Sequence, residues 1–199
     1  MDKREIHKAI RDKFHLSNKT RTNLPWCSGQ RYTRNHLAEL YCELEFTVGA
    51  EIGVRRGRYS EILCRKNPNL HLYCIDPWNA YENKYPIEKQ NEIFEYATKK
   101  LSQYNTTIIR KTSMDALADI RDGELDFVFI DGNHEFDHVM MDIILWSHKV
   151  RSGGIVSVHD VYHGEIGILK AVEAYVHSHN IVPWYTTKEI EPTAYWVKP

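Results

Sequence analysis

The 199-residue sequence has no long apolar run: its longest apolar stretches are shorter than ten residues, too short for a membrane-spanning helix. Its four cysteines show no C-x-x-C spacing, and two of them, Cys64 and Cys74, fall where buried helix and strand residues are expected. The opening residues, MDKREIHKAIRDKF, lack the apolar core of a signal peptide. These absences predict a protein of the reducing cytoplasm without a membrane anchor.

A dinucleotide fingerprint is also missing. The stretch 47–76 carries three glycines spaced by four, Gly49, Gly53 and Gly57, and not the G-x-G-x-x-G spacing of NAD-binding turns. Glu51 stands in the turn where a pyrophosphate would have to lie, and its carboxylate would repel that group but suit a cation. An NAD-linked dehydrogenase is therefore disfavoured.

The same stretch has the order of a βαβ unit. An apolar run at 48–54 is followed by a glycine-bearing turn, a helix that begins near Ser60, and a second apolar run at 72–75 that ends in Asp76. Glycines allow close approach of a ligand to the backbone, and an acid at the tip of the second strand can accept hydrogen bonds from a ribose diol. The pattern indicates a nucleoside site, although a glycine turn of an α/β protein without a ligand is the plainer alternative.

With its acid before a glycine turn and its ribose acid after the next strand, the stretch resembles the class I S-adenosylmethionine (SAM)-dependent methyltransferases. The usual E/D-x-G-x-G-x-G is reduced here to E-I-G-V-R-R-G. SAM carries an ammonium and a sulfonium and no phosphate, which suits the acid. The resemblance implies that Glu51 and Gly53 lie near the amino-acid end of SAM, Asp76 at its ribose, and Ser113 with Met114 near its adenine.

The remaining chain alternates helices and strands. Helices are expected over 2–16, 36–46, 87–104, from Ser113 onward, over 136–150 (ended by Gly153-Gly154) and over 165–179. Further strands are expected over 106–109, 125–130, 155–158, and in two C-terminal segments, 181–187 and 193–198. This order predicts an α/β fold: a Rossmann-like, doubly wound, mainly parallel sheet with an antiparallel C-terminal strand pair, as in class I methyltransferases.

The N-terminal segment is set apart by its charge. Residues 1–36 carry nine Lys/Arg against three Asp/Glu, although the whole chain has a net charge of −1. We expect residues 1–35 to form a helix and an arm that could act as a lid, and residues 36–199 to form the methyltransferase domain. No aromatic-interleaved basic patch is present, so a solvated helix is favoured over nucleic-acid binding, and an arm of this kind could also pair two copies as a homodimer.

Two polar clusters follow neighbouring predicted strands: Asp131-Gly132-Asn133-His134 and His159-Asp160. Parallel strands lie about 5 Å apart, so carboxylates at adjacent strand ends can share a divalent cation. Oxygen ligands favour Mg²⁺, Mn²⁺ or Ca²⁺, and a histidine would shift the preference toward Mn²⁺, Fe²⁺ or Zn²⁺.

Residues 126–160 resemble the metal-dependent small-molecule O-methyltransferases of the macrocin O-methyltransferase type, through the I-D-G-x-H turn, an aromatic two residues later, a helix, a G-G pair and a strand that ends in an acid. The resemblance implies that Asp131 and Asp160 are metal ligands and that His134 is the general base. Asp131 would also border the cofactor. His159, where relatives often have Glu or Asp, is the expected third ligand. The implied partners are SAM, Mg²⁺ or Mn²⁺, and a hydroxyl acceptor such as a sugar, a glycoside or a catechol-like ring.

Each assignment has an alternative. Asp131 could cap a helix, His134 could be a surface residue, and His159 could be a satisfied inner histidine. Aromatic residues such as Trp78 and Tyr81 could line the acceptor pocket or only pack. At the level of function, the alternatives are a metal-independent methyltransferase of an amine or macromolecule, a SAM- or nucleotide-binding module without chemistry, and a metallohydrolase.

Overall fold

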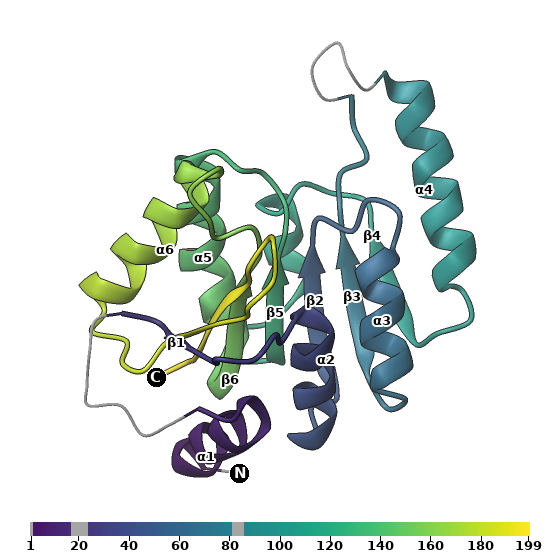
Figure 1. The fold of residues 1–199 in the computed structure, drawn as a ribbon. Coiled ribbons are helices and arrows are strands. Elements are labelled where there is room, and N and C mark those ends of the chain that lie inside the picture. Colours follow the sequence, from purple (N-terminus) through teal and green to yellow (C-terminus); the bar gives the residue numbers. More distant parts are fainter. Residues whose placement is uncertain (1, 17–23, 81–85) are drawn as a thin grey trace.

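The computed structural model describes residues 2–16, 24–80 and 86–199, which build one sheet covered by helices on both faces (Figure 1). The strands are β1 (Trp26–Cys27), β2 (Val48–Ile52), β3 (His71–Ile75), β4 (Thr106–Ile109), β5 (Leu125–Ile130), β6 (Val150–Val158), β7 (Tyr185–Thr186) and β8 (Ala194–Val197). The helices are α1 (Lys3–Phe14), α2 (Arg34–Glu43), α3 (Arg58–Lys66), α4 (Ile87–Leu101), α5 (Phe136–Lys149) and α6 (Ile166–Ser178), with a short 3₁₀ helix, η1 (Asp115–Asp119).

The eight strands follow the order β1-β7-β8-β6-β5-β2-β3-β4. Strands β2 to β6 pair in parallel, and β8 runs antiparallel to both β6 and β7. The predicted Rossmann-like sheet with an antiparallel C-terminal pair is confirmed. Parallel neighbours place their carboxyl ends along one edge, so the loops that follow β2, β3, β4, β5 and β6 meet there.

Two apolar cores lie on opposite faces of this sheet. Helices α1 to α4 pack on one face, where Phe127 and Phe129 of β5 are fully buried. Helices α5 and α6, with η1, pack on the other face over residues such as Val128 and Val156. Because successive strand side chains point to opposite faces, one continuous apolar run such as LDFVFI serves both cores.

The first helix belongs to the core. Ile6, Ile10 and Phe14 repeat every four residues along α1 and are almost completely buried against α2 and β8. The segment after it contributes β1, which pairs in parallel with β7 at the sheet edge, although a strand was not predicted there. Residues 17–23, part of the arm for which a lid was one possible role, lie outside the described residues.

The glycine pair was predicted to end the helix before it, and this was wrong. Helix α5 already ends at Lys149, and Gly153 and Gly154 lie inside β6, where the pairing with β5 shifts register. A Cβ on Gly154 would lie 2.4 Å from the carbonyl oxygen of Asp126, so only glycine permits this close approach of two backbones.

The helix expected to begin at Ser113 is also different. Only the 3₁₀ helix η1 forms, and the hydroxyl of Thr112, not that of Ser113, accepts a hydrogen bond from the Asp115 amide at 3.1 Å. Ser113 does not cap this helix, and it lies among the loops at the carboxyl ends of the strands.

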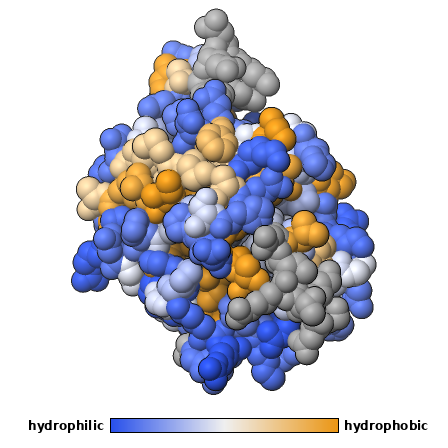
Figure 2. Space-filling model, turned by 90° about the vertical axis from the view of Figure 1, so that its left-hand side faces the viewer, coloured by the Kyte–Doolittle hydropathy of each residue, from blue (hydrophilic) through white to orange (hydrophobic). Residues whose placement is uncertain are grey.

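The surface is mixed. Seen from the side of α6, apolar patches stand among hydrophilic side chains (Figure 2). Large exposed apolar residues of the described chain include Met141, Ile144, Ile166 and Ile190. No helix within 2–16, 24–80 or 86–199 combines the length and the apolarity that crossing a membrane requires.

Candidate functional site

A cavity of about 750 Å³ opens at the carboxyl ends of β2, β3 and β5. Its walls are the loops after these strands, together with the residues before η1 and part of α5. The predicted site residues that line it are Gly53, Asp76, Ser113, Met114, Asp131 and His134. A cavity of this size can hold a drug-sized or cofactor-sized ligand.

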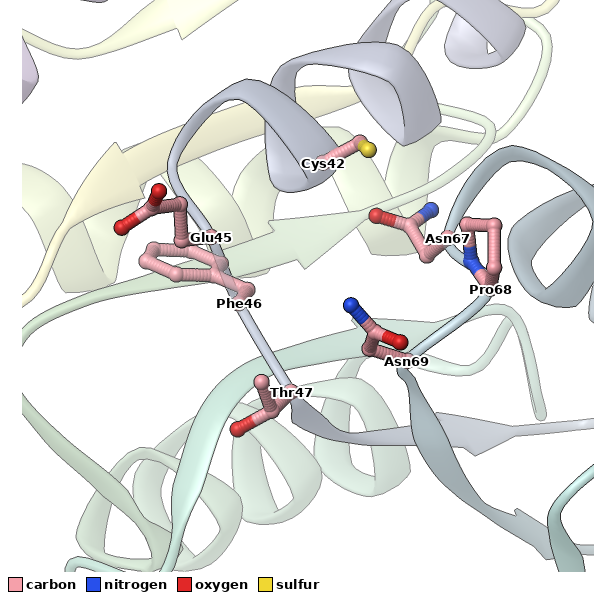
Figure 3. A pocket seen from close by; sticks show the side chains of 7 residues that line it. All are labelled: Cys42, Glu45, Phe46, Thr47, Asn67, Pro68 and Asn69. Carbon is pink, nitrogen blue, oxygen red and sulfur yellow. The ribbon is translucent and has the colours of Figure 1, made fainter.

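A smaller hollow of about 320 Å³ lies at the opposite, amino ends of β2 and β3 (Figure 3). There Asn67 donates hydrogen bonds to the carbonyl oxygens of Ala38 and Leu63, at 3.0 and 2.8 Å, and so joins α2 to α3. Ligands of doubly wound sheets bind at the carboxyl ends of the strands. The large cavity is therefore the candidate site.

The glycine turn after β2 brings two loops into contact. Gly53 has φ +91°, and a Cβ there would lie 2.0 Å from the carbonyl oxygen of Asp131. The Asp131 amide in turn donates to the carbonyl of Ile52 at 2.8 Å. Gly53 thus lets the first loop lie directly against the loop that carries Asp131 and His134.

Asp76 directly follows β3 at the cavity wall, at the strand tip where it was predicted. Its two carboxylate oxygens accept hydrogen bonds from the amides of Arg55 and Trp78, both at 2.8 Å. Burial raises the pKa of this carboxyl, and the hydrogen bonds oppose that rise. These contacts fix the side chain, and a carboxylate can accept additional hydrogen bonds from a ribose diol.

The end of the cavity where Ser113 and Met114 are predicted to border adenine contains a further polar side chain. Asp142 of α5 also lines the cavity and is only 3% exposed. Burial raises its pKa to about 6, while a hydrogen bond from Ser113 acts in the opposite direction. A carboxylate beside Ser113 gives this end of the cavity a hydrogen-bond acceptor.

Glu51 lies away from the cavity. It is 1% exposed, does not line the cavity wall, and accepts a hydrogen bond from the Ser60 hydroxyl of α3. Burial raises its pKa to about 8, and the Ser60 hydrogen bond only partly offsets this. Near neutral pH most of the population therefore holds a neutral carboxyl here, behind the glycine turn.

Three of the predicted residues form one compact group. Asp131, His134 and Asp160 each offer a ligand atom, and these atoms lie within 4.8 Å of one another. Burial raises the pKa of Asp131 to about 6, and the Asp160 carboxylate adds to this, while His159 and Arg34 oppose it. Burial acts to raise the pKa of Asp160 as well, but His159, His134 and Arg34 together outweigh it, and the pKa is lowered.

His134 stands between two carboxylates. Its Nε2 lies 3.5 Å from Oδ2 of Asp160, and its Nδ1 lies 3.3 Å from Oε2 of Glu165. The ring is 40% exposed and borders the cavity. A carboxylate beside one ring nitrogen orients the imidazole, so that the other nitrogen can take a proton.

His159 lies behind this group. It is 3% exposed, with Nδ1 2.8 Å from Oδ1 of Asp160 and Nε2 3.0 Å from Nη1 of Arg34. Nδ1 also lies 3.7 Å from Oδ1 of Asp131, so His159 is close to both carboxylates. The role of His159 as a third ligand therefore stays a prediction.

The alternative in which Asp131 caps a helix does not fit. Helix α5 begins after Glu135, and the side chain of Asn133 accepts the Glu135 amide at 2.7 Å. Trp78 lines the cavity, but it is only 1% exposed and packs edge-on against Phe94, so its position fits packing as well as an acceptor pocket. Tyr81 falls outside the described residues.

The group can accommodate a divalent cation. Three ligand atoms within 4.8 Å of one another need only a small contraction to surround one ion. Two carboxylates and one imidazole suit Mn²⁺ and, with additional waters, Mg²⁺. The guanidinium of Arg34, 3.5 Å from Oδ2 of Asp131, already provides positive charge at one edge of the group.

Three residues of this region were missed by the sequence predictions: Arg34, Asp142 and Glu165. Arg34 was counted only as part of a basic segment, and Asp142 and Glu165 lie on or beside helices far along the chain from the residues that they face. Their residue type alone gave no signal, because charged residues at such positions are usually solvated.

A family model described as a methyltransferase domain matches residues 50–161, more than half of the chain. No curated protein sequence matches.

Solved structures resemble the whole chain. The O-methyltransferase TomG from Streptomyces achromogenes, solved with SAM, is 16% identical, with a TM-score of 0.65 over 100% of this chain and 92% of that one. An O-methyltransferase from Bacillus cereus, solved with SAH, is 13% identical, with a TM-score of 0.63 and coverage of 100% and 92%. A protein from Staphylococcus aureus, assigned as a caffeoyl-CoA O-methyltransferase, is 17% identical, with a TM-score of 0.62 and coverage of 98% and 91%.

Proposed function

The chain belongs to the family of methyltransferase domains, and from this we propose that it transfers a methyl group from SAM to a hydroxyl of a small molecule. One observation carries the proposal: a single cavity contains both the ribose acid, Asp76, and the Asp131–His134 turn. A cofactor bound at Asp76 and an acceptor bound at the turn would therefore share one cavity. Two of the similar structures hold SAM or SAH, which supports this choice of cofactor.

The cavity has a cofactor end and an acceptor end. Gly53 gives the ligand access to the backbone, Asp76 accepts from the ribose hydroxyls, and Ser113 with Met114 borders the base. SAM, when bound, supplies a methyl group that leaves its sulfur and forms a bond to the acceptor oxygen. His134 takes the proton from that oxygen, and Glu165 holds the ring in place for the transfer.

We further propose that a divalent cation, Mg²⁺ or Mn²⁺, is held by Asp131 and Asp160. Such a cation supplies the positive charge that lowers the pKa of an acceptor hydroxyl. The two carboxylates would hold it close to His134, because the ligand atoms of all three residues lie within 4.8 Å of one another. Sugars, glycosides and catechol-like rings all offer a suitable hydroxyl.

The first test is calorimetric titration of SAM, SAH and NAD into the purified protein, with and without Mg²⁺ or Mn²⁺. We expect SAM and SAH to bind with micromolar affinity and NAD to give no signal. Absence of SAM and SAH binding under every metal condition would contradict the proposed function.

The second test uses Asp131→Ala with a panel of hydroxyl acceptors. Turnover should be abolished, because a ligand of the cation is lost, while SAM affinity stays within a few-fold. Normal turnover in this variant would exclude the role of Asp131 in the reaction.

The second candidate is a metal-independent methyltransferase that acts on an amine or a macromolecule. The contact of Arg34 with Asp131 favours it, because a guanidinium already balances part of the negative charge. Turnover that resists a chelator would support this candidate, and turnover that is lost with EDTA and restored by Mn²⁺ would support the metal-dependent one.

A further inference from the structure

A positive side chain beside the acidic group comes from the N-terminal segment. Arg34 begins α2, and its Nη1 lies 3.5 Å from Oδ2 of Asp131 and 3.0 Å from Nε2 of His159. A guanidinium has only donors, so Nε2 of His159 must be the acceptor of this contact. The remaining ring nitrogen, Nδ1, then carries the hydrogen and faces Asp160 at 2.8 Å.

Arg34 is held firmly in this position. Its amide donates to Oε1 of Glu189 at 2.7 Å, and its carbonyl accepts from the hydroxyl of Tyr59 at 2.8 Å. Its guanidinium also lies over the ring of Tyr59, 5.2 Å from the ring centre. The loop before β8, the helix α3 and the start of α2 together fix this charge, so the guanidinium is part of the site and not a freely moving surface group.

We propose that Arg34 is the resident counter-cation of the Asp131–Asp160 pair, and that a divalent cation reaches Asp131 only in competition with it. This inference rests on the metal site of the proposed function. A guanidinium beside Asp131 stabilises the carboxylates without a metal, and it repels an incoming cation. The residue thereby sets the metal affinity of the site and couples the start of α2 to the reaction centre.

Removal of this charge should strengthen metal binding. Arg34→Gln keeps a polar side chain but removes the positive charge of the guanidinium. In this variant only the metal can compensate the negative charge of the carboxylates. We expect the affinity for Mn²⁺ to rise at least tenfold, which corresponds to the loss of one nearby unit charge in a partly buried site. Arg34→Lys keeps the charge and should stay within about threefold of the wild type.

The experiment is calorimetric titration of MnCl₂ into the full-length wild type, Arg34→Gln and Arg34→Lys, without cofactor. Arg31→Gln is the matched control, because it removes one exposed arginine three residues earlier and should leave the affinity for Mn²⁺ unchanged. An Arg34→Gln protein that binds Mn²⁺ no more tightly than the wild type, or not at all, overturns the proposal.

Two further measurements separate a change in metal affinity from a loss of folding and from a failure of the cofactor site. Thermal unfolding shows that each variant is folded, and Arg34→Met, which keeps an apolar stem over Tyr59, replaces Arg34→Gln if the latter does not fold. Titration of SAH into the same proteins tests the cofactor half of the proposed function separately. If SAH fails to bind any of them, the proposed function fails, while the Mn²⁺ comparison still decides the role of Arg34.

Discussion

The buried carboxyl of Glu51 gives the protein a pH-dependent stability. Its pKa is raised to about 8 in the folded chain because of burial, whereas the unfolded chain has the ordinary value of 4.5. The stability associated with the neutral carboxyl is fully present below pH 4.5 and is lost as the pH rises through about 8.

Glu51→Gln should remove this dependence. The amide cannot ionise and can still accept from Ser60, so we expect the variant to be more stable than the wild type at pH 9 by roughly 3–5 kcal/mol, with little difference at pH 4. Denaturant unfolding at a series of pH values measures this, with the exposed Glu95→Gln as the control.

The same variant tests the predicted contact of Glu51 with the cofactor. Because the side chain lies behind the cavity wall, SAH affinity should stay within about threefold. A loss of more than tenfold would mean that the carboxyl reaches the ligand after all.

His134 is the residue that we expect to move a proton. His134→Ala should lower turnover by about 10²- to 10⁴-fold, the usual contribution of a general base. If Asp131 and Asp160 suffice as ligands, the affinities for Mn²⁺ and SAH remain within about threefold.

A parallel loss of Mn²⁺ affinity would instead make His134 a metal ligand, as its place in the compact group allows. Glu165→Gln should reduce turnover less, because it only weakens the orientation of the ring. His148→Ala, an exposed histidine at the far end of α5, is the control.

At the scale of elements, the site depends on how closely the loop after β2 approaches the loop after β5. Gly53→Ala places a Cβ 2.0 Å from the carbonyl oxygen of Asp131 and forces a side chain into φ +91°. Backbone cannot yield as a side chain can, so both loops must shift.

We expect Gly53→Ala to weaken SAH binding at least tenfold and to lower the melting temperature. Gly29→Ala is the matched control, because a Cβ there has no neighbouring atom within 4 Å. Wild-type SAH affinity in Gly53→Ala would show that this contact does not shape the cofactor site.

At the scale of the whole molecule, the question is whether the first helix, α1, is an integral part of the core or a loosely attached appendage. Ile10 of α1 is fully buried, so Ile10→Ala should lower the free energy of unfolding by about 2–5 kcal/mol. Ile190→Ala, at a position that is 85% exposed, should change it by less than about 0.5 kcal/mol. Equal effects in denaturant unfolding would show that α1 is only loosely attached.

The sequence by itself determined the order of elements and the edge at which the site forms. Apolar runs such as LDFVFI are buried on both sides and identify parallel strands, and parallel strands bring Gly53, Asp76 and Asp131 to one edge. These features follow from local periodicity and from the rules of chain connection, which are readable without coordinates.

Only the tertiary structure decided which side chains meet. Arg34, Glu165 and Asp142 lie far apart in the chain from the groups that they contact, and no local pattern specifies such contacts. The glycine pair of β6 was likewise misread, because a glycine that ends a helix and one that permits close strand pairing look alike in the sequence. Local order is fixed by neighbours along the chain, whereas charge balance in the site is fixed by neighbours in space.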